Sequence, residues 1–377
     1  MPPTYHESPP PSSPPITPPT YQANNQPPPP QVTPASASPS TYKDSSKPPA
    51  IFVFGDGLLD VGNNNYLQPS EVGEPHKSMT GRFSNGYNMG DLIGTYGFTG
   101  VNYASADAGI FNNPYISIIF PQQVEYFAAT RDQLEAQLGG LEPLNEFLSR
   151  SFFLIGVGAE DLVPSQFYTS WDRRPGVPGL IQLYGEKLMA LHEMGARRFG
   201  IINVGLIGCG REVDTRFNVS ADGCDNEVNK LAAEFNVALA TLLSSLSSKL
   251  PGFRYSLADF YGFMNATFAN PSAAGFVDIT SACYHYYPST PCSNVDQYWF
   301  WDDFAYPTQR AAYLAATTFY NGPEKFTTPV NFKQLSDMFA SLLCSGCFAA
   351  TTVFAVISSA TATAEIGLKS CTIGCKT

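Results

Sequence analysis

Residues 52–67 read FVFGDGLLDVGNNNYL, and this stretch decides the fold. It starts within a short, continuous apolar run, Ala50–Phe54, that ends at Gly55. Such a run predicts a β-strand buried on both faces, as in a parallel sheet. A polar loop follows, and its side chains are expected to hydrogen-bond the turn that leaves the strand. These side chains belong to Asp56, Asp60, Asn63 and Asn64.

Similar apolar runs alternate with amphipathic helices in the rest of the globular part. The further candidate strands are Val101–Ala104, Phe152–Val157, Phe199–Val204 and Phe253–Leu257. Two helical stripes lie among them, one from Leu180 to Leu191 with a capping glycine at Gly195, and one from Val228 to Leu246. This alternation predicts a three-layer α/β/α sandwich with a mainly parallel sheet, which binds ligands beyond the carboxyl ends of its strands.

Composition limits the kinds of partner. The chain has 377 residues, 44% of them hydrophobic, which is ample for one substantial core, and its net charge is −11. Its basic residues are scattered, whereas nucleic-acid binding needs clustered Lys and Arg to neutralise phosphates. The sequence therefore argues against nucleic acid and favours a solvated acidic surface.

The composition also divides the chain into three parts. Residues 1–49 are rich in Pro and Ser and predict a disordered segment, without the apolar stretch of an ordinary signal peptide. Residues 50–336 form the globular domain, and residues 337–377 form a tail. Residues 338–364 carry no charge and are long enough to contact or span a membrane. They are rich in Ser, Thr and Ala, so we favour a loosely structured tail over a membrane-inserted helix.

The eight cysteines are split evenly between the globular domain and the tail. Those of the tail are separated by a mostly uncharged, apolar spacer that is unlike a zinc ribbon, so we expect no metal and no other cofactor. Those of the domain suit two local disulfides if the chain is secreted. The candidates in the domain are Cys209, Cys224, Cys283 and Cys292.

Eight further blocks, together with the opening stretch, resemble the plant GDSL esterase/lipase family, a branch of the SGNH hydrolases. The resemblance implies a flavodoxin-like fold, hydrolysis of carboxylic esters, an ester or lipid ligand and an extracellular location. The blocks are GRFSNG (81–86), NYASADAGI (102–110), FFLIGVGAEDL (152–162), GARRFGIINVGLIGCG (195–210), CDNEVNKLAAEFNVAL (224–239), NPSAAGF (270–276), FWDDFAYPTQ (300–309) and PVNFKQL (329–335).

The family uses a serine nucleophile, a histidine base and an aspartate that orients the base. The resemblance places the nucleophile at Gly57, which has no side chain to attack a carbonyl. Asp302 stands at the triad acid, whereas Ala305 and Tyr306 stand where the histidine should be, with one residue inserted. The chain therefore lacks two of the three catalytic side chains of the family that it resembles.

The oxyanion hole of the family is also altered. The resemblance assigns it to the N–H groups of Gly57 and Ala106 and to the side chain of Glu160, where the family has Ser, Gly and Asn. Ala106 still offers an N–H, but Glu160 replaces an amide donor with an acceptor that is anionic at neutral pH. Since loss of one donor costs about 2.7–4 kcal/mol, and a carboxylate repels a developing oxyanion, this change disfavours hydrolysis. The family's next glycine is Asp107.

No substitute base is evident in the sequence. His6 lies in the Pro-rich segment, His192 on the helix before Gly195, and His285 in a loop flanked by cysteines. We interpret His192 and His285 as ordinary surface or packing residues.

Three hypotheses follow for function. The first is a catalytically inactive family member that binds a lipid or an acyl ester. The second is an active carboxylic-ester hydrolase that uses unrecognised groups. The third is a disrupted or misassembled coding sequence. The Pro-rich segment 1–49, the tail 337–377 and the short connection 95–100 agree with this hypothesis. Asn218 and Asn265 lie in sequons and are candidate glycosylation sites, and the sequence does not indicate an oligomeric state.

Overall fold

The computed structural model describes residues 48–69, 76, 78, 80–111, 116–163, 175–210, 223–285 and 290–345. Within these residues a six-stranded sheet has the order β2-β1-β3-β4-β5-β8. Only β8 is antiparallel to its neighbour among these strands, so the prediction of a mainly parallel sheet is confirmed. The strands are β1 (Ile51–Gly55), β2 (Gly100–Asn102), β3 (Phe152–Gly156), β4 (Arg198–Ile202), β5 (Arg254–Ala258) and β8 (Thr327–Thr328).

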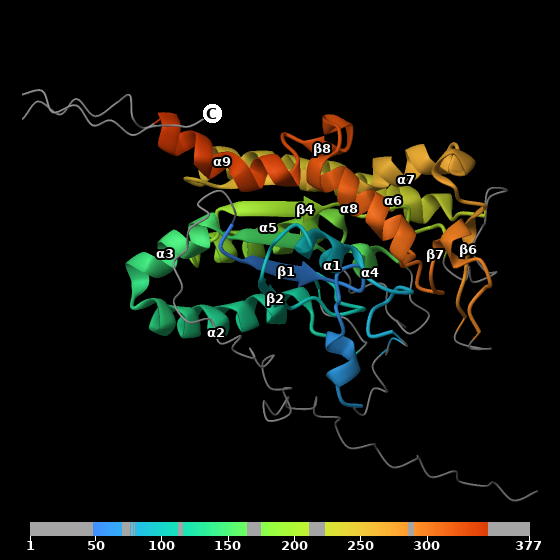
Figure 1. The fold of residues 1–377 in the computed structure, drawn as a ribbon, viewed down its shortest axis with the longest axis horizontal. Coiled ribbons are helices and arrows are strands. Elements are labelled where there is room, and N and C mark those ends of the chain that lie inside the picture. The colour runs from blue at the N-terminus through green and yellow to red at the C-terminus, as the bar shows by residue number, and fades with distance from the viewer. Residues whose placement is uncertain are drawn as a thin grey trace, which may run out of the picture.

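Helices cover both faces of the sheet and make the three predicted layers. Figure 1 shows α8 and α9 along one side of the strands and α2 along the other. The first face packs against α2 (Phe120–Leu138), α3 (Leu141–Arg150), α5 (Val177–Glu193) and α6 (Asn226–Lys249). The second packs against α1 (Met89–Gly94), α7 (Phe260–Phe268), α8 (Gln309–Asn321) and α9 (Phe332–Ser345).

Alternate side chains of each strand enter two different cores. Along β1, Phe52 and Phe54 pack on the face that α2 and α5 cover. Ile51 and Val53 pack on the opposite face, with α1 and α8. Because both faces are covered, the strand is apolar at every position, and this is the pattern that the sequence displays.

The five predicted strands are confirmed, each within two residues of its expected ends. Gly195 follows α5 with φ 116°, as expected of a glycine at a helix C-terminus. The short connection after α1 is also present, since α1 ends at Gly94 and β2 begins at Gly100. The sequence analysis missed β8 and a second, two-stranded sheet of β6 (Asp278–Ala282) and β7 (Tyr298–Phe300).

The strand order places a binding crevice between β1 and β3. In a sheet of this order, the connections from these two neighbouring strands run to opposite faces and open a crevice beyond their carboxyl ends. Gly57 follows β1, and the short helix α4 (Ala159–Leu162) follows β3. The loop after β7 carries Asp302 and Tyr306 to the same region.

The four cysteines of the domain are paired as two local disulfides, Cys209 with Cys224 and Cys283 with Cys292. Among the described helices, α6 alone is long and apolar enough to cross a membrane, and its apolar face packs in the core. Residues 1–47 and 346–377 lie outside the described residues, as does Asn218. The predictions for the N-terminal segment and for most of the tail therefore stay predictions.

Candidate active site

Gly57 lies in the tight turn that follows β1. Its backbone N–H donates to Oη of Tyr306 at 3.2 Å. A Cβ added to Gly57 would lie 2.6 Å from the same oxygen, inside the space of the Tyr306 ring. The φ of Gly57 is outside the left-handed region that favours glycine. The backbone would therefore accept a side chain at residue 57, and the Tyr306 ring is what excludes one.

A tight hairpin, residues 302–306, brings Tyr306 to this position. Asp302 is buried, and its Oδ1 accepts the N–H groups of Phe304 at 3.2 Å and of Tyr306 at 3.3 Å. Ala305 completes the turn with φ 65°. The residue at the triad-acid position thus organises the turn that carries Tyr306, and this turn contains no histidine for it to orient.

Ala106, the second predicted oxyanion donor, is also engaged. Its N–H donates to Oδ2 of Asp60 at 3.0 Å. The same carboxylate accepts the N–H groups of Gly62 and Asn63, each at 2.7 Å. Burial raises the pKa of Asp60 to about 6, although the backbone donors oppose this shift. The expectation that Ala106 keeps an available N–H is therefore wrong, because Asp60 uses it to fix the loop.

Asp56 and Asp60 accept N–H groups within the turn after β1, as predicted. The same polar loop also bonds β2 and the segment after it, which was not predicted. Asn63 Nδ2 donates to the carbonyl oxygens of Asn102 at 3.1 Å and Ala104 at 2.8 Å. Asn64 Nδ2 donates to the carbonyl oxygen of Ala106 at 3.1 Å. These side chains act as structural links between the turn after β1 and the segment after β2.

Glu160 lies in α4 and is 9% exposed. Its neighbour Asp161 accepts the N–H groups of Ile110 at 2.7 Å and Phe111 at 3.0 Å, which fixes α4 against the segment after β2. An ionised carboxylate can only accept hydrogen bonds. Glu160 thus puts a carboxyl group where the resemblance assigns an amide donor.

A histidine that the sequence analysis left unassigned lies beside these residues. His76 Nδ1 is 2.8 Å from Oδ2 of Asp107, and its ring centroid is 4.5 Å from that of Phe304. Burial would lower the pKa of His76. The hydrogen bond and charge of Asp107, together with the charges of Glu160 and Asp302, outweigh burial and raise this pKa above its usual 6.5.

The sequence contained one signal for this pair. Asp107 has φ 63°, a backbone conformation that favours glycine, and the family has glycine there. A carboxylate at such a position indicates that its side chain has a specific partner. The partner itself was hidden, because His76 lies in a stretch with no helical or strand periodicity, 31 positions before Asp107.

The other described histidines lie in packing or surface contacts. His192 Nε2 is 2.9 Å from the carbonyl oxygen of Pro251. His285 Nδ1 is 2.6 Å from Oδ1 of Asp303, and its side chain is 52% exposed. Within the described ranges, no three or more His, Cys, Asp or Glu side chains are grouped so as to hold a metal ion.

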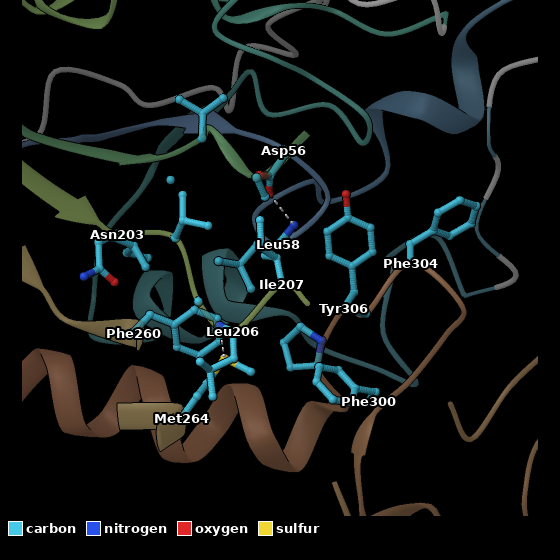
Figure 2. Close-up of a pocket in the computed structure, with 18 residues that line it drawn as sticks. Asp56, Leu58, Asn203, Leu206, Ile207, Phe260, Met264, Phe300, Phe304 and Tyr306 are labelled. Carbon is cyan, nitrogen blue, oxygen red and sulfur yellow. Dashed lines mark hydrogen bonds between the residues drawn. The ribbon is translucent and has the colours of Figure 1, made fainter. Parts of the chain in front are cut away.

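An apolar cleft lies beside Tyr306, at the carboxyl ends of β1, β3 and β4. Figure 2 shows Tyr306 between Leu58 and Phe304, with Asp56 at the edge where β1 ends. The cavity volume is about 50 Å³. An apolar cavity of about 150 Å³ is enough to bind benzene, so this cleft admits a smaller group. Its apolar walls include Val157, Ile202, Leu206, Phe260, Met264 and Phe300.

The wall after β4 is fixed by hydrogen bonds. Asn236 of α6 accepts the N–H of Val204 at 3.0 Å and donates to its carbonyl oxygen at 2.7 Å. The N–H of Leu206 points to Sδ of Met264 at 3.3 Å. These bonds fix the part of the cleft wall that follows β4, because the N–H groups of Val204 and Leu206 already have partners.

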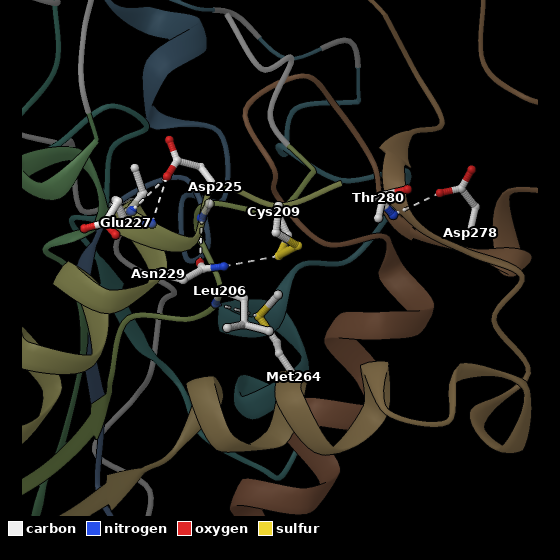
Figure 3. Close-up of a disulfide and its surroundings, with 11 residues drawn as sticks. Leu206, Cys209, Asp225, Glu227, Asn229, Met264, Asp278 and Thr280 are labelled. Atoms are coloured by element: carbon white, nitrogen blue, oxygen red, sulfur yellow. Dashed lines mark hydrogen bonds between the residues drawn. A yellow bond between two sulfur atoms is a disulfide. The ribbon is translucent and has the colours of Figure 1, made fainter. Parts of the chain in front are cut away.

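The disulfide Cys209–Cys224 also stabilises the cleft wall that follows β4. Figure 3 shows Asn229, on α6, pointing to the sulfur of Cys209, with Nδ2 3.4 Å from Sγ. Asn229 Oδ1 also accepts the N–H of Gly208 at 2.8 Å. The end of the cleft wall is thus tied covalently to Cys224, just before α6, and by hydrogen bonds to Asn229 in the first turn of α6.

Comparisons with known proteins show the family of this chain. The model of the GDSL-like lipase/acylhydrolase family matches residues 51–317. GDSL esterase/lipase At1g71691 of Arabidopsis thaliana is 32% identical over 335 residues, covering 77% of this chain and 86% of that protein. At2g23540 of the same plant is 31% identical over 345 residues, covering 77% and 88%.

Among solved structures, a catalytic mutant of Axe2, an acetylxylan esterase from Geobacillus stearothermophilus, aligns with a TM-score of 0.38 and 10% identity. The alignment covers 72% of this chain and 94% of that chain. The family model spans well over half of the chain, and the Arabidopsis relatives are covered over most of their length. This chain therefore belongs to the GDSL lipase/acylhydrolase family.

Proposed function

We propose that this chain does not hydrolyse esters by the mechanism of its family and that it retains the cleft as a binding site for a small acyl ester or lipid group. The observation that carries the proposal is the position of Tyr306. Its ring takes the space of a nucleophile side chain, and its Oη accepts the N–H of Gly57. Family membership supplies the ester class of the ligand.

Each step of the family mechanism lacks a group. In a serine hydrolase, loss of the nucleophile alone lowers kcat by about 10⁶-fold. What remains in such variants comes from the oxyanion hole and from substrate binding. Here the N–H groups of Gly57 and Ala106 already donate to Tyr306 and Asp60, so this remaining contribution is also reduced.

The size of the cleft points to a short ligand. An apolar, preformed cavity binds an apolar group without a cost for ordering its walls. With a volume of about 50 Å³, it has room for the end of a short acyl group, and most of an octanoyl chain would extend beyond it. The ligand is therefore a short-chain ester or the end of a larger molecule that carries such a group.

The test uses the full chain in two assays. Hydrolysis of p-nitrophenyl butyrate should not exceed the background rate. Methyl butyrate should raise Tm in a saturable way, since a ligand that binds the folded state stabilises it, and methyl octanoate should raise it less. Turnover that disappears on Asp302→Asn would overturn the claim of inactivity. The absence of saturable binding by folded protein would overturn the claim of binding.

A matched pair of variants locates the binding site. Ile207 is half-buried in the wall of the cleft, and Ile207→Phe should fill the cleft and abolish the Tm shift. Ile181 is half-buried on α5, against the core and away from the cleft, so Ile181→Phe should keep the shift. Loss of the shift in both variants, or in neither, would place the ligand elsewhere.

An extracellular location is part of the proposal. The disulfides Cys209–Cys224 and Cys283–Cys292 favour an oxidising compartment, where such bonds form and persist. A tagged full chain recovered from the culture medium of plant cells would support this location. Retention inside the cells with reduced cysteines would contradict it. Mass-spectrometric peptides that span residues 40–60 and 330–350 would contradict the hypothesis of a misassembled coding sequence.

A further inference from the structure

Two strained residues flank one contact in the site. Among the described residues, the non-glycine residues with a left-handed φ are Asp107 at 63° and Ala305 at 65°. This conformation costs a residue such as Ala305 about 1–2 kcal/mol, whereas aspartate adopts it more readily than most residues other than glycine. Such strain clusters at ligand clamps and switch regions, where the surrounding structure maintains it. Asp107 pairs with His76, and His76 lies on Phe304, which directly precedes Ala305.

These contacts hold the hairpin 302–306 at two points. At one point Tyr306 Oη accepts the N–H of Gly57 at 3.2 Å. At the other the ring of Phe304 lies on His76, with a centroid distance of 4.5 Å, and His76 is anchored to Asp107 at 2.8 Å. Because Phe304 and Tyr306 are two residues apart, both contacts act on the same short hairpin.

We propose that His76 and Asp107 form a proton-dependent latch that keeps the hairpin 302–306 closed over Gly57, and that loss of the proton from His76 lets Tyr306 leave the N–H of Gly57 and widens the cleft. This inference rests on the proposed binding function, since a binding site is what the latch would open. It gives a role to a titratable pair that the family's catalytic residues do not include.

The charges around His76 set the direction of the switch. The carboxylates that act on it come from three elements: Asp107 after β2, Glu160 in α4 and Asp302 in the hairpin. Protonated His76 compensates these charges and attracts the ring of Phe304, as a cation does over an aromatic face. Once His76 is neutral, Asp302 on the hairpin is left with like charges on the other two elements, and their repulsion favours opening.

The pH range follows from the pKa of His76. Burial lowers this pKa, but the hydrogen bond to Asp107 and the three charges raise it above 6.5 overall. The closed state therefore holds the proton more tightly than an open state does. Closure is fully stabilised below pH 6.5, and this stabilisation is lost as the pH rises through the raised pKa.

The hairpin carries a second histidine contact that serves as a control. His285 Nδ1 is 2.6 Å from Oδ1 of Asp303, next to Asp302. Its side chain is 52% exposed, whereas that of His76 is 31% exposed. His285→Phe removes this second titratable group from the hairpin without touching the contact between His76 and Asp107.

Hydrogen exchange of the full chain, read by mass spectrometry at pH 5.5 and 8.5 and corrected for intrinsic exchange rates, tests the latch. Protection of the peptides that contain Gly57 and Tyr306 should fall at least tenfold from pH 5.5 to pH 8.5. A peptide from β4 should keep its protection, which shows that the fold is intact. His76→Phe retains a ring on Phe304 but binds no proton. In this variant the peptides that contain Gly57 and Tyr306 should be equally protected at the two pH values. His285→Phe should behave as the parent does.

Three outcomes would overturn the latch. They are equal protection of the parent at both pH values, parental pH dependence in His76→Phe, and loss of pH dependence in His285→Phe. No ester is present in this experiment. A failure of the binding proposal therefore leaves the exchange result unchanged, and a failure of the latch leaves the Tm shift with methyl butyrate unchanged.

Discussion

The backbone N–H of Gly57 donates to the phenol oxygen of Tyr306 across 3.2 Å, although 249 positions separate the two residues in the chain. The contact joins the turn after β1 to the hairpin after β7. In the family mechanism this N–H stabilises a developing oxyanion. Here it is part of a packed cluster in which Tyr306 lies with Phe83 and Ala106.

Gly57→Ser alone should destabilise the protein and give no activity. The new Cβ would fall within the Tyr306 ring, and overpacking of this kind costs about 1–3 kcal/mol. Tyr306→Ala removes the ring, so Gly57→Ser should cost much less in that background. Urea unfolding of the two single variants and the double variant measures the coupling. Additive effects would show that the two side-chain positions do not compete for the same space.

Tyr306→Phe should lower the free energy of unfolding by about 1–3 kcal/mol, because it leaves the buried N–H of Gly57 without its acceptor. Tyr103→Phe is the matched control, since Tyr103 Oη donates to Oγ1 of Thr130 at 2.8 Å and makes no contact with Gly57. Hydrogen exchange should show faster exchange around Gly57 in Tyr306→Phe only. Unchanged exchange there would mean that the phenol oxygen does not hold this N–H.

Ionisation of Asp60 should lower the free energy of unfolding as the pH rises. Its pKa is raised by burial from 3.8 to about 6, so the folded state holds the proton more tightly than the unfolded state. The cost of the buried carboxylate is absent below pH 3.8 and complete above about pH 6. A pKa difference of this size between the folded and unfolded states corresponds to about 3 kcal/mol.

Asp60→Asn does not ionise and isolates this effect. Relative to Asp60→Asn, the parent should lose about 3 kcal/mol of unfolding free energy between pH 3.5 and pH 7. The two proteins share every other titrating group, so their contributions cancel. A difference that is constant over this range would show that Asp60 does not titrate as described.

Removal of the disulfide Cys209–Cys224, by replacing both cysteines with serine, should cost about 3 kcal/mol, as expected for a loop that spans 15 positions. Because this bond anchors the wall of the cleft to α6, the Tm shift with methyl butyrate should also weaken. Replacement of Cys283 and Cys292, which close a loop of 9 positions, should leave the shift intact. Equal loss of binding in both variants would indicate a global effect of destabilisation.

The sequence predicted the sheet because its strands are buried on both faces. Runs such as those of β1 and β3 are apolar at every position, and this pattern is local. It did not predict β8, a two-residue edge strand that pairs antiparallel with β5. A strand of two threonines carries no periodicity, so tertiary pairing alone defines it.

The sequence predicted which residues belong to the candidate site, but not how their side chains are arranged. Gly57 contacts Tyr306, and Tyr306 contacts Asp302. That Tyr306 fills the site, and that Asp60 takes the N–H of Ala106, depend on side-chain directions set by the fold. The pair of His76 and Asp107 joins segments without a common motif, and only the unusual aspartate at a glycine position indicated it.

The measurement that tests the account most directly is hydrolysis of p-nitrophenyl butyrate by the full chain and by a restored variant. The restored variant combines Gly57→Ser and Glu160→Asn with replacement of the pair Ala305 and Tyr306 by one histidine. The account predicts no turnover above background by the unaltered chain and measurable turnover by the restored one. Turnover by the unaltered chain that purifies with the protein and disappears on Asp302→Asn would contradict it.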